Sequence, residues 1–234
     1  MGRDVVGIGF IAALLCIAGC ASREDVSATS SSLNPDRELV RSALWTLAAG
    51  SDQEPAYLLA WEAADGTRTA SGLGPVLHGV RWRDQIAYVD RAHTLRLSEE
   101  SQPLATDVVG APVVSEDVLG FVRIDETARG TWFELHRVSD RHRVLARARG
   151  SLGDLRIAPG GQAIFGVGAR NGGVAGLWVA DAAGLRCLTN CNLRVGEPWG
   201  DAFVPPPSTD TLRFDGPEVL FDTPHGAMRR RWQP

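Results

Sequence analysis

Cysteine is the residue type whose positions in this chain indicate specific chemistry. There are four cysteines: Cys16 and Cys20 follow an apolar run near the N-terminus, and Cys187 and Cys191 are separated by three residues near the other end. A cysteine thiol can accept a lipid, pair with a second thiol or bind a metal ion. The outcome depends on the segment that carries the thiol and on the compartment that the segment reaches.

The first residues have the order of a secretory signal peptide. A short polar head containing Arg3 precedes an apolar run over residues 5–15, and small residues follow. Signal peptides combine a positive start, an apolar stretch of about 7–15 residues and small residues at the cleavage site. A membrane-spanning helix needs about 20 apolar residues. Residues 5–21 are marginal for that length, so an uncleaved N-terminal anchor is the alternative.

The end of the apolar run carries a more specific pattern. Ile17, Ala18 and Gly19 stand before Cys20, and this arrangement resembles the lipobox of bacterial lipoproteins. The resemblance implies that residues 1–19 are removed, that the Cys20 sulfur carries a diacylglyceryl group and that the new amino group takes a fatty acid such as palmitate. Two or three acyl chains, at about 0.8 kcal/mol for each buried methylene, anchor a protein permanently in a membrane.

The segment after the predicted anchor is polar and rich in serine. Ala21 stands where an aspartate often retains such lipoproteins in the inner membrane, so the resemblance implies the outer membrane, facing the periplasm, in a cell with two membranes. Residues 20–36 are predicted to be the lipidated cysteine and a flexible tether, and residues 37–234 a folded domain. The formal net charge of −4 argues against a nucleic-acid partner, because such proteins are usually basic.

Two cysteines remain once the signal peptide is removed and Cys20 is lipidated. In an oxidising compartment two thiols this close usually pair, and three intervening residues allow the chain to turn back so that the Cα atoms come within about 7 Å. We therefore predict a disulfide between Cys187 and Cys191. Two free thiols, or a metal or redox site, are the alternatives, although a structural zinc ion needs four ligands and no histidine lies nearby in the sequence.

After residue 55 the sequence signals are those of β-strands. Short runs rich in Val, Ile, Phe, Tyr and Trp are punctuated by Gly, Pro and Asp. No convincing helix lies between them, which disfavours parallel βαβ units. Residues 37–49 differ, because their apolar residues recur at helical spacing. We predict one amphipathic helix there, with a strand as the alternative; its apolar positions are Leu39, Val40, Ala43, Leu44 and Leu47.

The strand signals recur with a fixed period. Residues 152–189 contain four predicted strands, and the same order of signals recurs at residues 112–145 and 80–104. A leucine lies in the last strand of each unit, and Leu104, Leu145 and Leu188 are spaced by about the 40–45 residues of one four-stranded propeller blade.

The two ends of the domain carry partial units. Residues 57–69 resemble the last two strands of a unit and residues 199–223 the first two, which fits a ring closed by pairing the chain ends. We predict an all-β, small β-propeller-like domain of four blades, or of five if residues 37–54 supply another sheet. A β-sandwich is the alternative fold.

The unit over residues 152–189 resembles the repeats of TolB-type and WD-like propellers. TolB-type repeats place a Ser-Pro-Asp-Gly turn after the first strand and end in Leu-Thr. Here residues 158–161 read Ala-Pro-Gly-Gly, whereas Leu188 and Thr189 keep the ending. The resemblance implies a binding or scaffolding propeller of the bacterial envelope.

The domain has no recognisable catalytic motif. No nucleophile elbow, phosphate-binding loop, calcium loop or metal-ligand spacing is present in the sequence, so we predict no catalytic residue, no metal ligand and no cofactor. The seven tryptophans are predicted to wedge between blades, or in part to line a channel and stack on sugars. Arg229, Arg230 and Arg231 are predicted to form a solvated tail, with contact to an anionic surface as the alternative. The five histidines are scattered: His78, His93, His136, His142 and His225.

These patterns predict a membrane-anchored, non-enzymatic binding or scaffolding domain for an envelope protein or glycan. The alternative is an envelope enzyme or glycan-processing accessory whose site gathers residues from several blade loops, since dispersed residues leave no local motif. A purely structural lipoprotein is a third possibility. An enzyme should concentrate polar groups with shifted pKa values at one mouth of the channel, whereas a binding domain should present an apolar or aromatic patch.

Overall fold

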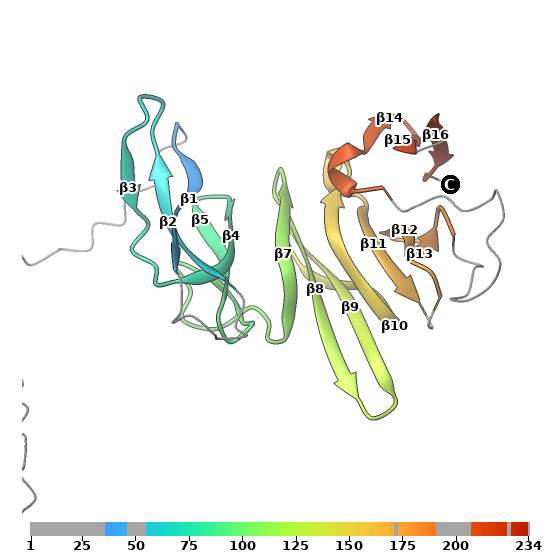
Figure 1. Cartoon of the computed structure of the whole chain (residues 1–234), viewed down its shortest axis with the longest axis horizontal. Coiled ribbons are helices and arrows are strands. Elements are labelled where there is room, and N and C mark those ends of the chain that lie inside the picture. Colours follow the sequence, from blue (N-terminus) through green and yellow to red (C-terminus); the bar gives the residue numbers. More distant parts are fainter. Residues whose placement is uncertain (1–35, 46–54, 171–172, 191–206, 224–225, 234) are drawn as a thin grey trace, which may run out of the picture. The chain divides into compact units, whose positions relative to one another are not determined.

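Antiparallel β-sheet makes up the domain in the computed structural model, which describes residues 36–45, 55–170, 173–190, 207–223 and 226–233 (Figure 1). Among these residues there is no α-helix, and so no helix long and apolar enough to cross a membrane. The strands form three sheets of six, seven and three strands. The prediction of an all-β domain is therefore confirmed.

The first sheet contains the N-terminal strands in the order β1-β2-β4-β5-β6, and β3 pairs with β2. Its strands are β1 (Glu38–Trp45), β2 (Ala56–Glu62), β3 (Arg68–Ala70), β4 (Val76–Trp82), β5 (Gln85–Asp90) and β6 (Leu95–Leu97). The second sheet runs in chain order from β7 to β13, and the third from β14 to β16. Most strands therefore pair with their neighbours in sequence, joined by short turns.

The helix predicted for residues 37–49 is wrong over the part that the structure describes. Residues 38–45 are strand β1, which pairs with β2 through Leu39↔Trp61 and Val40↔Ala60. A single short helix is only marginally stable by itself, and tertiary packing usually determines whether the segment is helical. The backbone here gains a ladder with β2 instead, with one register shift between Arg41 and Ala43. Because β1 joins the first sheet, it does not supply a separate sheet.

Strand β10 (His142–Ile157) links two groups of four strands. Its first half pairs with β9 (Gly130–Val138), and its second half, from Gly150 onward, pairs with β11 (Ile164–Arg170). Gly150 lies at this change of partner with a φ of 123°, and a Cβ there would lie 2.0 Å from the Ala169 carbonyl oxygen. Only glycine fits this backbone and this close approach.

The strand order predicted for residues 152–189 is confirmed. The second half of β10 is followed by the short 3₁₀ turn η1 (Pro159–Gly161), then β11, β12 (Gly176–Asp181) and β13 (Gly184–Cys187). The group before it contains β7 (Val108–Ser115), β8 (Val118–Thr127), β9 and the first half of β10. The earliest group, β4 to β6, ends in a single bridge between Leu95 and Ala105 rather than in a fourth strand.

Three apolar clusters lie between successive groups of strands. The first joins the first sheet to β7–β9 and contains Leu77, Trp82 and Phe121; the second joins β8–β10 to β11–β13 and contains Phe133 and Trp178. The third joins β11 and β12 to the C-terminal sheet of β14 (Arg213–Asp215), β15 (Glu218–Thr223) and β16 (Gly226–Arg231). Leu104, Leu145 and Leu188 each pack against one of these clusters.

The two ends of the domain do not pair with each other in the part that is described. Strands β1–β3 belong to the first sheet, whereas β14–β16 form a sheet of their own. Residues 226–231 are not a free tail, because they form β16, paired with β15 along its length; Arg229, Arg230 and Arg231 are nevertheless exposed, as predicted. Arg229 donates to the Glu218 carboxylate at 2.7 Å, whereas Arg230 donates to the Leu188 carbonyl oxygen at 3.3 Å.

Candidate functional site

The first strands of four successive groups meet at one hollow, which we call the first-strand hollow. Its volume is about 540 Å³, and β4, β7, β10 and β14 all contribute to its lining. It is lined by Val80, Pro112, Val113, Val114, Ser115, Glu116, Leu155, Arg156, Ile157, Pro159, Asp210 and Phe214. Val80 and Phe214, which are more than 130 positions apart in the sequence, therefore line the same hollow.

The lining of the first-strand hollow is mainly apolar. Aliphatic and proline side chains supply most of it, and Val113 and Val114 are only half-buried, so their side chains remain accessible. The charged lining residues are Glu116 and Asp210, which are exposed, and Arg156, which is half-buried. Such a surface can bury apolar groups of a ligand and offers few polar groups to orient it.

Arg156 is held rigidly in this lining. Its Nη1 donates hydrogen bonds to the carbonyl oxygens of Thr209 and Asp210, at 2.9 and 2.8 Å. Its guanidinium carbon lies 5.5 Å from the centre of the Phe214 ring, within the range of a cation–π contact. Asp154, on the same strand, accepts hydrogen bonds from the Thr209 backbone N–H at 2.9 Å and the Thr209 hydroxyl at 3.0 Å.

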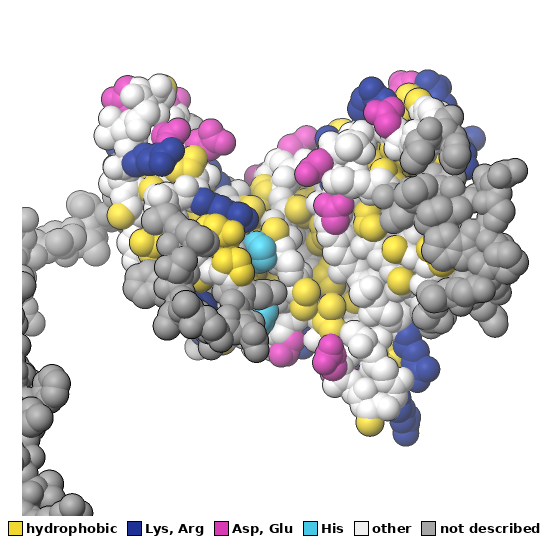
Figure 2. All heavy atoms as spheres, in the orientation of Figure 1, with side chains coloured by type: hydrophobic (Ala, Val, Ile, Leu, Met, Phe, Trp, Pro, Cys, Tyr) yellow, Lys and Arg dark blue, Asp and Glu magenta, His cyan; other side chains and the backbone are white. Residues whose placement is uncertain are grey.

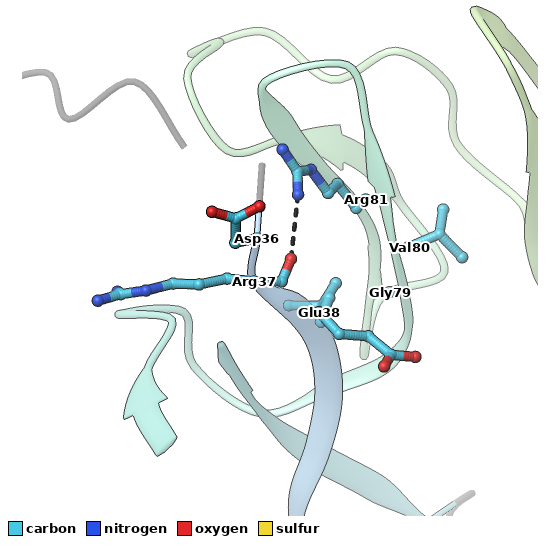
Figure 3. Close-up of a pocket in the computed structure, with 7 residues that line it drawn as sticks. Asp36, Arg37, Glu38, Gly79, Val80 and Arg81 are labelled. Atoms are coloured by element: carbon cyan, nitrogen blue, oxygen red, sulfur yellow. Dashed lines mark hydrogen bonds between the residues drawn. The ribbon is translucent and has the colours of Figure 1, made fainter. Parts of the chain in front are cut away.

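A second hollow of about 540 Å³ lies where the start of β1 approaches β4 (Figure 3). Residues 36–39 and 79–81 line it. The Arg81 Nη1 donates a hydrogen bond to the Arg37 carbonyl oxygen at 3.0 Å, while the Arg37 side chain extends away from it (Figure 3). The bond ties the beginning of the domain to β4.

Two of the histidines that are scattered in the sequence lie together in the structure. His136 Nδ1 and His142 Nε2 are 2.8 Å apart, so one imidazole N–H donates to the bare nitrogen of the other. The Phe121 ring stacks on His136 at 4.7 Å with only 6° between the planes. On the other side of the ring, His136 Nε2 lies 3.4 Å from a Glu134 oxygen. The β9–β10 hairpin produces this proximity, because its two strands place both side chains on one face.

Burial lowers the pKa of both histidines. Desolvation, followed by the neighbouring His142, lowers the pKa of His136 from 6.5 to about 4, although Glu134 opposes the shift. Desolvation and the positive charge of Arg123 lower the pKa of His142 as well. Glu134 itself lies between Arg123 at 3.5 Å and Arg147 at 3.3 Å. The contact of Glu134 with the His136 imidazole orients that ring. Neither histidine, nor Glu134, lines the first-strand hollow.

The side chains in the described part of the chain do not form a metal site. No group of three or more His, Cys, Asp or Glu residues there is placed to hold a metal ion. Sequence reasoning missed the histidine pair because 136 and 142 match no ligand spacing. The available signal was two histidines flanking the short turn over residues 139–141, which a hairpin places on one face.

The predicted cysteine sites are described only in part. Cys20 and the residues before it, Ile17, Ala18 and Gly19, lie outside the described residues, so lipidation stays a prediction. Cys187 lies in β13 and is disulfide-bonded. Cys191, its predicted partner, lies outside the described residues, so this pairing also stays a prediction.

The described tryptophans are mainly structural. Trp82, Trp178 and Trp232 belong to the three clusters between strand groups, as expected for wedging side chains. Trp82 and Trp178 donate their indole N–H to the carbonyl oxygens of Asp117 and Gly168, each at 3.0 Å. No tryptophan lines the first-strand hollow within the described ranges.

Neither the distribution of surface charge nor similarity to known proteins indicates a ligand. Figure 2 shows acidic, basic and apolar side chains interspersed over the face drawn, without one large basic area. No protein-family model matches the chain, and no curated protein has significant similarity to it.

Proposed function

We propose that this chain is a lipid-anchored envelope protein whose domain binds a partner protein in the first-strand hollow. The observation that carries the proposal is the lining of the hollow, to which four strands far apart in the sequence, β4, β7, β10 and β14, all contribute. In a propeller, the first strand of every blade surrounds the central channel. A propeller-like ring of four blades therefore accounts both for the repeat period and for the meeting of these strands.

The apolar character of the hollow supports binding rather than catalysis. Half-buried Val113 and Val114 of β7 line it together with Leu155 and Ile157 of β10, which are buried, and an apolar concave surface is typical of a docking site. The imidazoles with lowered pKa values, His136 and His142, lie outside this lining. An enzyme would be expected to gather such groups at the cavity itself.

The nature of the lining also favours a protein partner over a glycan. Sugar-binding sites usually offer aromatic faces, and the described aromatic residue in this hollow is Phe214, with Arg156 over its ring. Aliphatic side chains and Pro112 dominate the rest, and these suit the apolar side chains of a peptide segment. Lipid on Cys20 and the tether over residues 20–36 would hold the hollow near the membrane surface, where envelope partners are concentrated.

Position-specific photo-crosslinking tests this proposal. A photoreactive amino acid in place of Val113 should form a discrete product with one envelope protein in intact cells. The same residue in place of Glu126, which is exposed on β8 and lines neither hollow, is the matched control and should not form it. A Cys20→Ser variant should lose the product through mislocalisation. A correctly lipidated protein without any specific product at Val113 would contradict binding in the hollow.

The histidine pair supports a second candidate function, an envelope enzyme or glycan-processing accessory. His142 is exposed, and its hydrogen bond to His136, which in turn contacts Glu134, orients it in the way that supporting groups orient a general base. Turnover of envelope glycan fragments that disappears in a His142→Ala variant, with folding intact, would favour this function. Crosslinking at Val113 without such turnover would favour binding.

A further inference from the structure

The guanidinium of Arg156 has an unused binding edge. A guanidinium carries five N–H donors in a rigid plane. Both Nη1 hydrogens are taken by the carbonyl oxygens of Thr209 and Asp210. The Nε–H and the two Nη2 hydrogens have no acceptor among the residues that the structure describes. These remaining donors form the fork that matches the two oxygens of a carboxylate.

Arg156 also lacks an ion-pair partner within the described residues, although carboxylates lie close to it. No side-chain oxygen of Glu116 or Asp210 is within ion-pair distance of it, and both residues are exposed to solvent at the margin of the hollow. The Asp154 carboxylate is occupied by Thr209. By contrast, Arg186, which is buried to a similar degree, pairs with Asp181 at 2.7 Å.

The surroundings strengthen the attraction of Arg156 for an anion. Arg156 as a residue is half-buried, its guanidinium lies over Phe214, and the buried Leu155 and Ile157 line the same hollow. Charge interactions in such partly desolvated surroundings are stronger than in water. The two carbonyl hydrogen bonds already fix the Arg156 side chain. Binding of a carboxylate would therefore cost little further side-chain entropy at Arg156.

We infer that Arg156 binds a carboxylate of the partner segment, either a chain-terminal carboxylate or an Asp or Glu side chain, while an adjacent apolar group of the segment packs against Val113. This inference rests on the proposed binding in the first-strand hollow and specifies the chemistry that is recognised there. The partner segment is thus apolar with one acid group, and the carboxylate sets its position in the hollow.

Titration of the full-length protein with a matched pair of probes tests the inference. The probes are N-acetyl-leucyl-leucine with a free carboxylate and the same dipeptide as its amide, followed through the arginine Nε–H signals in ¹H–¹⁵N spectra. An Arg156→Lys variant assigns the Arg156 signal by its disappearance. The carboxylate should shift this signal and bind at least about tenfold more tightly than the amide, because a hydrogen bond to a charged group contributes that much or more.

Variants separate recognition from folding. Arg156→Gln should abolish the preference for the carboxylate, and Arg156→Lys should retain only part of it, since ammonium cannot form the fork. Arg213→Gln, which removes an exposed arginine paired with Asp222 on the C-terminal sheet, should keep the full preference. Unchanged backbone spectra establish that each variant is folded.

Three outcomes would overturn the inference: equal binding of carboxylate and amide, a preference that survives in Arg156→Gln, or binding of neither probe. If both probes bind equally and shift the Val113 signal, binding in the hollow stands and only the role of Arg156 fails. If neither probe binds and crosslinking at Val113 is also absent, the proposed function fails with it.

Discussion

Acid should destabilise this protein through His136. The side chain is 5% exposed, and its pKa is lowered from 6.5 to about 4, first by burial and then by the charge of His142. In the unfolded chain the same imidazole binds its proton near the ordinary pKa. The unfolded state therefore takes up this proton at a higher pH than the folded state does, and acidification favours unfolding.

The size of the effect follows from the two pKa values. Each unit of difference corresponds to about 1.4 kcal/mol, so the whole shift is linked to about 3 kcal/mol of stability. This stability is present above about pH 6.5 and is lost as the pH falls toward 4. Between pH 7 and pH 5 the expected loss is about 2 kcal/mol. That is a large part of the total stability of a typical domain, about 5–15 kcal/mol.

Urea unfolding at pH 7 and pH 5 measures this loss. The test variant is His136→Phe, which keeps a ring of similar shape stacked on Phe121 but cannot bind a proton. The wild type should lose about 2 kcal/mol more than this variant between the two pH values. A His142→Asn variant should show an intermediate loss, because it removes the second cause of the shift and leaves burial, the first cause, in place.

Equal pH dependence of the wild type and His136→Phe would refute this reasoning. It would mean that the imidazole is charged in the folded state or is not buried in solution. A decrease in the urea m-value at pH 5 would point instead to a change in the unfolding transition itself.

Three other changes have defined outcomes. Gly150→Ala should lower the free energy of unfolding by at least about 1–3 kcal/mol, since a Cβ there would meet a backbone oxygen at 2.0 Å; a neutral result in thermal and urea unfolding would contradict the described change of partner in β10. Asp154→Ala should cost about 1–3 kcal/mol because it leaves the Thr209 donors without their acceptor, and Thr209→Val should add little in the double variant, as a double-mutant cycle would measure. The intact mass of the membrane-extracted protein should equal that of residues 20–234 plus acyl chains, and an unmodified Cys20 would count against the lipoprotein prediction. Alkylation without reductant should leave Cys187 unlabelled.

Several features of the fold could be predicted from the sequence because they depend on local patterns. Alternating apolar residues and Gly- or Asp-containing turns determine short strands and tight hairpins, which is why the order over residues 152–189 was correct. The segment over residues 38–45 could not be assigned in this way. Its apolar spacing suits a helix, and only the presence of β2 beside it makes the strand more favourable.

The candidate site depended almost wholly on tertiary structure. The residue types of the lining carry no motif, and Val80, Val113, Arg156 and Phe214 come together because three apolar clusters stack the strand groups against one another. The histidine pair likewise required the register of β9 and β10, since a shift of one residue would move a side chain to the other face.

By itself the sequence determined the β-rich class of the domain and the order of its strands over residues 152–189, both of which arise from neighbouring residues. The tertiary structure decided the location of the hollow, the fixed geometry of Arg156 and the lowered pKa of His136. Burial and orientation are properties of distant groups brought together, and short-range patterns do not encode them.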